Sequence, residues 1–205
     1  MSGRRAEAAR NDGRILDAAR EVFVANPGAP ISAVAERAGV GISALYRRYA
    51  SKEELLRRLC ADGLQLYIAA AEDALADEEG DAWSAFADFM RRIVDADTHS
   101  LTLRLAGTFA PTEELYRDSE KAQELNVRLI ERTKAAGVLR GDIEVDDIAL
   151  LLEQLAAVRI GEEERTHQLR RRYLALLLDA LCAPSGSRLP GPPPTWEEIG
   201  QRWGT

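Results

Sequence analysis

Side chains that bind phosphates and base edges gather within a few residues of one another near the start of the chain. Ser43, Tyr46, Arg47 and Arg48 lie on one face of a short helical pattern over residues 42–49. Hydroxyl and guanidinium groups hydrogen-bond to phosphate oxygens and base edges, and an Arg side chain can bind guanine through two parallel hydrogen bonds. We therefore expect this face to contact DNA.

The opposite face of the same segment must hold the helix against the core of the chain. Ile42, Leu45 and Tyr49 share that face, and Val40 precedes it as an apolar residue that attaches the turn to the core. The segment is therefore amphipathic, with a polar face that is expected to lie in a DNA groove.

A second helical segment precedes the turn. Ala35 and Ala38 are small and apolar, as residues must be where two helices cross closely, and Gly39 then lets the backbone turn without a steric cost. The two segments and the turn between them predict a helix-turn-helix.

A further helix is expected directly afterwards. Ser51 and Glu54 have the types and spacing of a capping box, with Ser51 as the N-cap residue. Lys52 is then placed at a helix N-terminus, where backbone N–H groups and an ammonium group can bind one phosphate together.

The order and spacing of residues 31–55 resemble the helix-turn-helix of the TetR family of bacterial repressors. The chain departs from the family pattern at Pro30-Ile31, where Thr is common, at Gly41, where Ser or Thr is usual, at Arg48, where His or an aromatic residue is usual, and at Tyr49, where Phe is usual. The residues that carry the resemblance are Val34-Ala35, Ala38-Gly39-Val40, Leu45-Tyr46, Tyr49, Ser51-Lys52 and Leu55.

This resemblance implies a homodimeric regulator that binds a double-stranded DNA operator through its N-terminal domain and a small molecule through its C-terminal domain. In the family, the last two helices of each subunit form a four-helix interface, which here implies pairing through residues 146–160 and 163–182. Together with the residue types, it assigns DNA contact to Ser32, Gly41, Ser43, Ala44, Tyr46, Arg47, Arg48, Tyr49 and Lys52.

Charge is distributed unevenly along the 205 residues, whose net charge is −7. Residues 1–60 contain eleven Lys and Arg against seven Asp and Glu, a net charge of +4, so the remainder carries −11. The basic end is the candidate for contact with a polyanion, and the acidic remainder argues against general coating of nucleic acid. No run approaches the roughly 20 apolar residues that cross a bilayer, and the Arg-rich N-terminus lacks the apolar segment of a secretory signal, so we expect a cytoplasmic protein.

Helical periodicity predicts an all-α chain. We expect an N-terminal three-helix DNA-binding domain at 1–56, a helical ligand-binding and dimerisation domain at 57–182, and a Pro-rich tail at 183–205. A short helix after Thr195 is expected in this tail, and disorder of the tail is the less favoured alternative. Residues 1–10 are expected to be a disordered terminus or a flexible arm. The predicted helices cover residues 10–25, 52 to about 76, 82–94, 101–109, a short segment from 112, then 120–136, 146–160 and 163–182.

The region 83–160 contains the candidates for a ligand pocket. Aromatic and Met side chains at helical spacing are more often plain core, so the polar residues within apolar patterns weigh more, because a buried polar group needs a partner. The candidates are Trp83, Phe86, Phe89, Met90, His99, Arg104, Phe109, Tyr116, Gln123, Asn126, Gln154 and Arg159.

Catalytic and metal chemistry find little support. Residues 39–44 fit the dinucleotide-binding spacing GxGxxA, but that motif requires a preceding strand, and residues 32–38 are Ala- and Glu-rich and helical. His99 and His167 are the only histidines, and neither belongs to a metal or nucleophile motif. We expect no cofactor and no metal, and Cys60 and Cys182 are expected to be buried thiols, a redox-sensing disulfide being the rarer alternative.

The sequence thus predicts a DNA-binding transcriptional regulator, a repressor released from a palindromic operator by a small molecule. The alternative is a helical small-molecule-binding or adaptor protein that no longer reads DNA, and an enzyme is a distant third. Specific, salt-dependent binding to a palindrome separates the first from the second.

Overall fold

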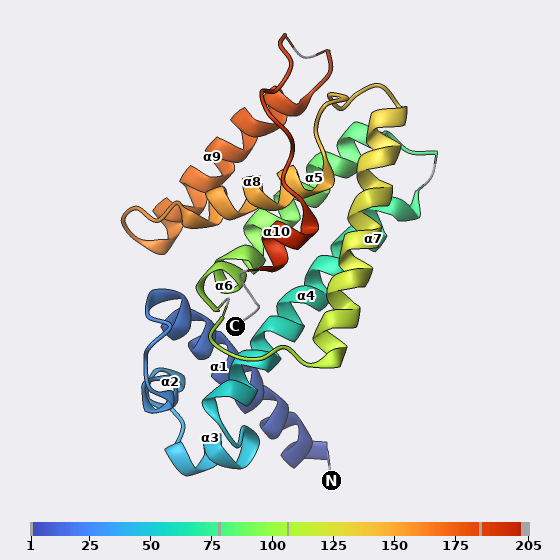
Figure 1. Cartoon of the computed structure of the whole chain (residues 1–205). Helices are drawn as coiled ribbons and strands as arrows, with labels where there is room; N and C mark the ends of the chain where they lie inside the picture. Colours follow the sequence, from blue (N-terminus) through green and yellow to red (C-terminus); the bar gives the residue numbers. More distant parts are fainter. Residues whose placement is uncertain (1, 78, 106, 185, 202–205) are drawn as a thin grey trace.

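A computed structural model describes residues 2–77, 79–105, 107–184 and 186–201, without the side chains of residues 2–9 and 102–104. Over these ranges the chain forms helices and no strand, which confirms the all-α prediction (Figure 1). The helices are α1 (Ser2–Ala25), α2 (Ile31–Ala38), α3 (Ile42–Arg48), α4 (Lys52–Ala76), α5 (Ala82–Asp95), α6 (Thr98–Leu105), α7 (Glu113–Ala135), α8 (Val145–Ala157), α9 (Glu163–Leu181) and α10 (Trp196–Gly200).

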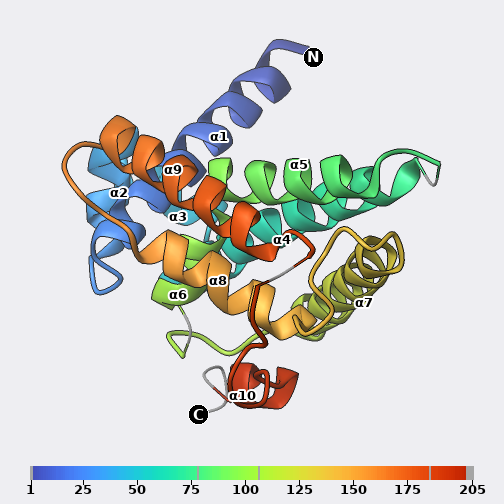
Figure 2. The ribbon, with the colours of Figure 1, turned by 90° about the horizontal axis from the view of Figure 1, so that it is seen from above.

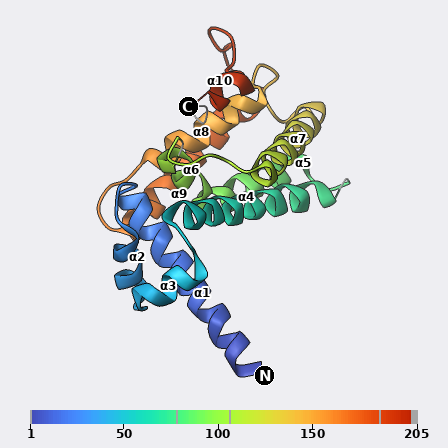
Figure 3. The same ribbon diagram turned by 60° about the horizontal axis from the view of Figure 1, so that its bottom comes forward.

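Helices α1 to α3 form a small group at one end of the molecule, and α4 runs from this group into the larger body (Figure 1). The core of the small group includes Phe23 from α1, Val34 from α2 and Leu45 from α3. Figure 3 shows the first turns of α1 extending beyond α3, away from the larger body. The backbone of residues 2–10 is helical, so the expectation of a disordered arm is wrong there.

The core of the small group also includes residues from later in the chain. Leu101 and Leu105 of α6, together with Phe109 and Leu115, are buried against α1 to α4. Leu64 of α4 packs against both this core and the core of the larger body. The small group of α1 to α3 and the C-terminal helices are therefore joined through packed side chains on α4 and α6.

The larger body is formed by α4, α5 and α7 to α9. Seen from above, α8 and α9 lie on one side of α5 (Figure 2), and α7 packs against α4. The segment predicted as two helices, one from residue 112 and one over 120–136, is a single helix, α7, since nothing between Tyr116 and Glu120 breaks a helix. Thr112 begins it as an N-cap, accepting a hydrogen bond from the Leu115 N–H at 3.3 Å.

The C-terminal tail follows the body before its final helix. Arg140 donates a hydrogen bond to the Ser187 carbonyl at 2.7 Å, and the Leu189 N–H donates to Asp142 at 2.7 Å. Thr195 and Glu198 form the predicted capping box, and α10 follows them. No helix in the described ranges is long and apolar enough to cross a membrane.

Gly39 ends α2 with φ of 63°, in the left-handed region that favours glycine. An added Cβ there would lie 2.9 Å from Nη2 of Arg14, which itself donates to the Ala38 carbonyl at 2.6 Å. Arg14 thus caps the C-terminal end of α2 from α1, and a side chain at Gly39 would displace the guanidinium end of Arg14.

We expect Gly39→Ala to lower the free energy of unfolding by about 1–3 kcal/mol, because it combines backbone strain with the displacement of Arg14. Urea unfolding followed by circular dichroism measures this. Gly13→Ala is the matched control, since Gly13 lies inside α1 with nothing within 4 Å of the added Cβ. It should raise stability by up to about 1 kcal/mol, and an equal effect of both substitutions would contradict the assignment.

Candidate DNA-binding face and effector cavity

The exposed face of α3 consists of the residues that the sequence indicated for base and phosphate contact. Ser43, Tyr46 and Arg47 are exposed, and Leu45 on the opposite side is fully buried. Among the described residues, Arg47 has no ion-pair partner. The structure therefore exposes one hydroxyl and one phenol on this short helix, together with the guanidinium group of Arg47, which is unpaired among the described residues.

Ile42 lies elsewhere than expected. The sequence placed it with Leu45 and Tyr49 on the core side, but 39% of its surface is exposed. It occupies the first turn of α3, beyond the part of the helix that α1 and α2 cover. Its side chain is therefore an exposed apolar group on the same helix, which the helical period alone did not reveal.

Arg48 is bound within the chain. Its Nε and Nη2 donate to the two carboxylate oxygens of Asp12 on α1 at 2.8 and 2.7 Å. The Arg48 guanidinium holds the pKa of Asp12 below its usual value, and Asp12 in turn raises the pKa of Arg48. The ion pair thereby fastens the end of α3 to α1.

Tyr49 belongs to the core of this end of the molecule. It is buried, and its hydroxyl donates to Oδ1 of Asp12 at 2.6 Å. Burial is the larger cause of the raised pKa of Tyr49, and the hydrogen bond to Asp12 is the next. The structure thus gives Tyr49 a packing role rather than an accessible surface.

Lys52 is similarly occupied. Its ammonium group donates to the carbonyls of Pro27 and Ala29 at 2.7 and 2.8 Å and lies 5.0 Å from the centre of the Phe23 ring. It ties the loop between α1 and α2 to the start of α4, where Ser51 accepts the Glu54 N–H at 3.1 Å.

The remaining candidates for DNA contact surround the turn. Ser32 is exposed on the first turn of α2, Gly41 is exposed at the start of α3, and Ala44 is half-buried. The structure therefore brings Ser32, Gly41, Ser43, Ala44, Tyr46 and Arg47 to the accessible side, whereas Arg48 and Lys52 have partners within the chain.

The ligand-pocket candidates are dispersed. Some are core: Phe86, Phe89 and Met90 are fully buried, Trp83 packs beside Phe86, and Phe109 belongs to the core of the small helix group. Others face solvent: Tyr116, Gln154 and Arg159 are exposed. The side chain of Arg104 lies outside the described residues.

Two polar candidates have partners between helices. Asn126 accepts a hydrogen bond from the Tyr67 hydroxyl at 2.9 Å, and Gln123 donates to Asp146 at 3.2 Å. Burial raises the pKa of Asp146. For Asn126 and Gln123 the partner is a protein group.

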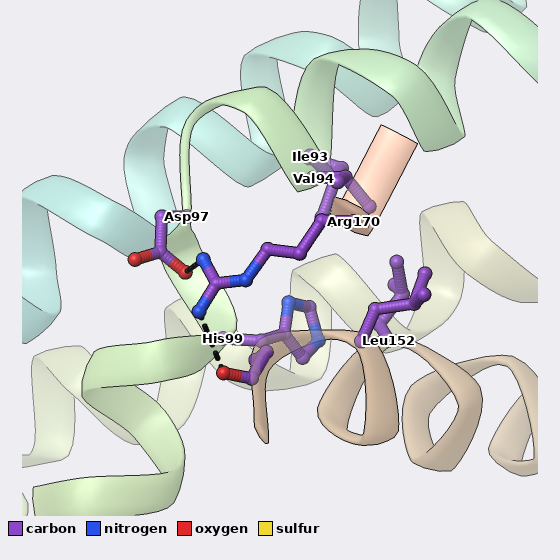
Figure 4. A pocket seen from close by; sticks show the side chains of 8 residues that line it. Ile93, Val94, Asp97, His99, Leu152 and Arg170 are labelled. Atoms are coloured by element: carbon purple, nitrogen blue, oxygen red, sulfur yellow. Dashed lines mark hydrogen bonds and ion pairs between the residues drawn. The ribbon is translucent and has the colours of Figure 1, made fainter. Parts of the chain in front are cut away.

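A small cavity lies between α5, α6, α8 and α9. Its volume is about 10 Å³, room for about one water molecule. Figure 4 shows Arg170, Asp97, His99 and Leu152 around this space. The lining residues are Ile93, Val94, Asp97, His99, Leu152, Leu155, Ala156 and Arg170, of which sequence reasoning named His99 alone.

Arg170 is the largest charged group inside the body, with 2% of its surface exposed. Its Nη1 pairs with Asp97 Oδ1 at 2.6 Å, and its Nη2 donates to Ser100 Oγ at 3.1 Å. It also donates to the carbonyls of Ala156 and Val158, at 2.6 and 3.1 Å. One side chain of α9 thus caps the end of α8 and holds the start of α6.

Arg170 binds the carbonyls of Ala156 and Val158, which explains why α8 ends at Ala157, before the predicted residue 160. Asp97 has φ of 50°, in the left-handed region, and its carboxylate also accepts a hydrogen bond from Ser100. Arg170 stands in a run of three arginines, a pattern typical of a solvated helix face, so sequence reasoning missed it.

A larger, open groove lies between α4 and α7. Its volume is about 350 Å³, and its walls include the Lys121–Glu72 ion pair. In the described part of the chain, no cluster of His, Cys, Asp and Glu has the composition of a metal site.

Helix α9 has an exposed apolar strip beside its buried one. Leu174 and Leu178 are buried, whereas Tyr173, Leu176 and Ala180 face outward, and 57% of the surface of Leu176 is exposed. The helix thus has apolar surface beyond what the core of its own chain covers.

Comparisons with known families match two parts of the chain. Residues 15–59 match the family described as bacterial regulatory proteins, tetR family. Residues 81–183 match a family described as transcriptional regulator SbtR-like, C-terminal domain. A search of curated protein sequences gave no match.

Solved structures with the same fold cover nearly the whole chain. A TetR transcription regulatory protein from Mycobacterium vanbaalenii is 27% identical, with a TM-score of 0.57 over 87% of this chain and 99% of that one. The regulator PfmR from Thermus thermophilus is 22% identical, with a TM-score of 0.62 over 86% and 97%. LfrR from Mycobacterium smegmatis, solved in complex with proflavine, is 23% identical, with a TM-score of 0.58 over 81% and 95%.

Burial of His99 makes stability depend on pH. Burial lowers the pKa of His99 to about 4. The unfolded chain therefore takes up a proton near pH 6.5 that the folded chain takes up only near pH 4. The contribution of His99 to the free energy of unfolding is thus fully present above pH 6.5 and is lost as the pH falls towards 4.

We expect His99→Gln to reduce the loss of unfolding free energy between pH 7 and 5 by about 1–2 kcal/mol, measured by urea unfolding at each pH. His167→Gln is the control and should leave that loss in place, because the His167 ring is not enclosed in the core. Equal pH dependence in wild type and His99→Gln would refute the prediction.

Proposed function

The chain belongs to the TetR family of bacterial regulatory proteins, and we propose that it is a homodimeric transcriptional repressor, released from a palindromic operator by a small-molecule effector. The observation that carries this proposal is the accessible face of α3. Ser43, Tyr46 and Arg47 face outward while Leu45 anchors the helix in the core. An exposed short helix with this composition suits the major groove.

Two copies of α3 are needed for useful specificity, because one short helix contacts few base pairs. We propose that the pairing uses α8 and α9, through the outward strip of Tyr173, Leu176 and Ala180. A two-fold axis between these helices would present two reading helices to successive turns of one face of the duplex.

The effector is proposed to act at the cavity beside Arg170. The cavity is too small for an organic ligand, so binding must separate α8 and α9 from the start of α6. Because α6 also packs in the core of the DNA-reading end, a displacement there can reposition α3. The effector weakens DNA binding only to the extent that it prefers the opened arrangement.

DNA binding is tested by selecting binders from a random duplex library and measuring affinity for the selected palindrome. Arg47→Ala should weaken operator binding by about 1–3 kcal/mol. Arg91→Ala, on α5 and paired with Asp88, is the control and should bind as wild type does. If no duplex is selected while a small molecule or a protein binds, the adaptor alternative is correct instead.

Dimerisation is tested by Leu176→Glu, which places a charge in the proposed interface. We expect light scattering after gel filtration to show a monomer and operator binding to fall at least tenfold, since each half-site then binds alone. Leu66→Glu changes an equally exposed leucine on α4 and should remain dimeric. A dimeric Leu176→Glu protein would exclude this interface.

A further inference from the structure

Two neighbouring arginines at the end of α3 have different surroundings. Among the described residues, Arg47 has no ion-pair partner, whereas Arg48 is held by both carboxylate oxygens of Asp12. The side chain of Arg48 is 58% exposed and that of Asp12 17% exposed. The carboxylate thus lies against the protein surface and the guanidinium covers it from outside.

Three hydrogen bonds keep Asp12 in this position. Besides the two from Arg48, the Tyr49 hydroxyl donates to Oδ1 at 2.6 Å. Because Tyr49 is buried, its hydroxyl fixes the carboxylate from the core side. Parallel two-point pairing of this kind is the strongest arrangement that a guanidinium makes with a carboxylate.

We propose that Asp12 is a specificity-determining residue of the DNA-binding face, which competes with DNA phosphates for Arg48 and so lowers sequence-independent affinity. This inference rests on the proposed function, since it concerns how the same face treats DNA. A phosphate offers Arg48 two anionic oxygens for the same two-point pairing that Asp12 already provides, so binding it requires giving up the internal pair.

The competition weakens non-specific binding more than operator binding. Sequence-independent affinity comes from cations that neutralise phosphates and release counterions, and a free Arg side chain can reach a phosphate in any loosely bound register. In the operator complex, base contacts of α3 fix one register, and a flexible additional cation contributes less. Binding of the Arg48 side chain by Asp12 of α1 therefore raises the ratio of specific to non-specific DNA affinity.

The test is a double-mutant cycle of Asp12 and Arg48 in the full-length chain, in which the affinity for duplex DNA of scrambled sequence is measured. Asp12→Asn keeps the shape and the acceptor for Tyr49 but removes the charge that holds Arg48. We expect it to raise affinity for the scrambled duplex about five- to tenfold and to steepen the slope of log K against log salt by about one per subunit. In the Arg48→Gln background the same substitution should have less than about a third of that effect.

Asp17→Asn is the matched control, since it removes one exposed carboxylate from the same helix. Its effect should be smaller and independent of Arg48. An Asp12→Asn effect that is absent, or equal with and without Arg48, would overturn the inference while leaving the proposed function intact. A wild-type protein that binds neither the scrambled duplex nor any selected palindrome would refute the proposed function, and the inference with it.

The double variant Asp12→Asn/Arg48→Gln keeps the test decisive if a single variant unfolds, because it has the net charge of wild type and no unpaired partner. Affinity for the scrambled duplex within about twofold of wild type supports the inference, because the native pair then contributes no phosphate contact. A loss of fivefold or more shows that Arg48 already binds phosphate in the wild type and overturns it.

Discussion

The arrangement of the C-terminal helices depends on one buried guanidinium group. Arg170 neutralises Asp97, satisfies two carbonyls at the end of α8 and binds Ser100 at the start of α6. Burial of a charge is costly unless it is paired and hydrogen-bonded, and here the contacts come from the start of α6 and from the end of α8. The requirement to satisfy one cation therefore fixes three segments relative to one another, namely α9, the end of α8 and the start of α6, and any ligand that enters the adjoining cavity must disturb that set.

The DNA-reading end is held by a comparable set of cations at its surface. Arg14 caps α2, Lys52 binds the loop between α1 and α2, and Arg48 fastens α3 to α1. Each of these cations binds a group of its own chain, although the net positive charge of this domain suggested that its cations bind DNA. Of the two cations on α3, Arg47 has no ion-pair partner among the described residues, so the unpaired positive charge of this face is smaller than the composition implies.

The fold was largely predictable, because amphipathic spacing and caps determine where helices form. Ser51, Thr112 and Thr195 begin helices as their types indicate. The helix-turn-helix followed from residues in close sequence proximity. The partners of Arg48 and Arg170 could not be predicted, since Asp12 and Asp97 are remote in sequence and only the tertiary fold brings them near. Ile42 shows the remaining difficulty: periodicity assigns a face, but which part of that face a neighbour covers depends on packing.

Burial of α6 in the core of the first helices has a consequence for how such proteins can be recombined. Leu101 and Leu105 complete a core whose other members come mainly from α1 to α4. A chimera that joins helices α1 to α4 to the C-terminal domain of another protein must therefore keep α6, or supply side chains that fill the same space. Chimeras divided after α4 would leave an apolar gap, whereas those that keep α4 and α6 together preserve the packing between the N-terminal helices and the larger body.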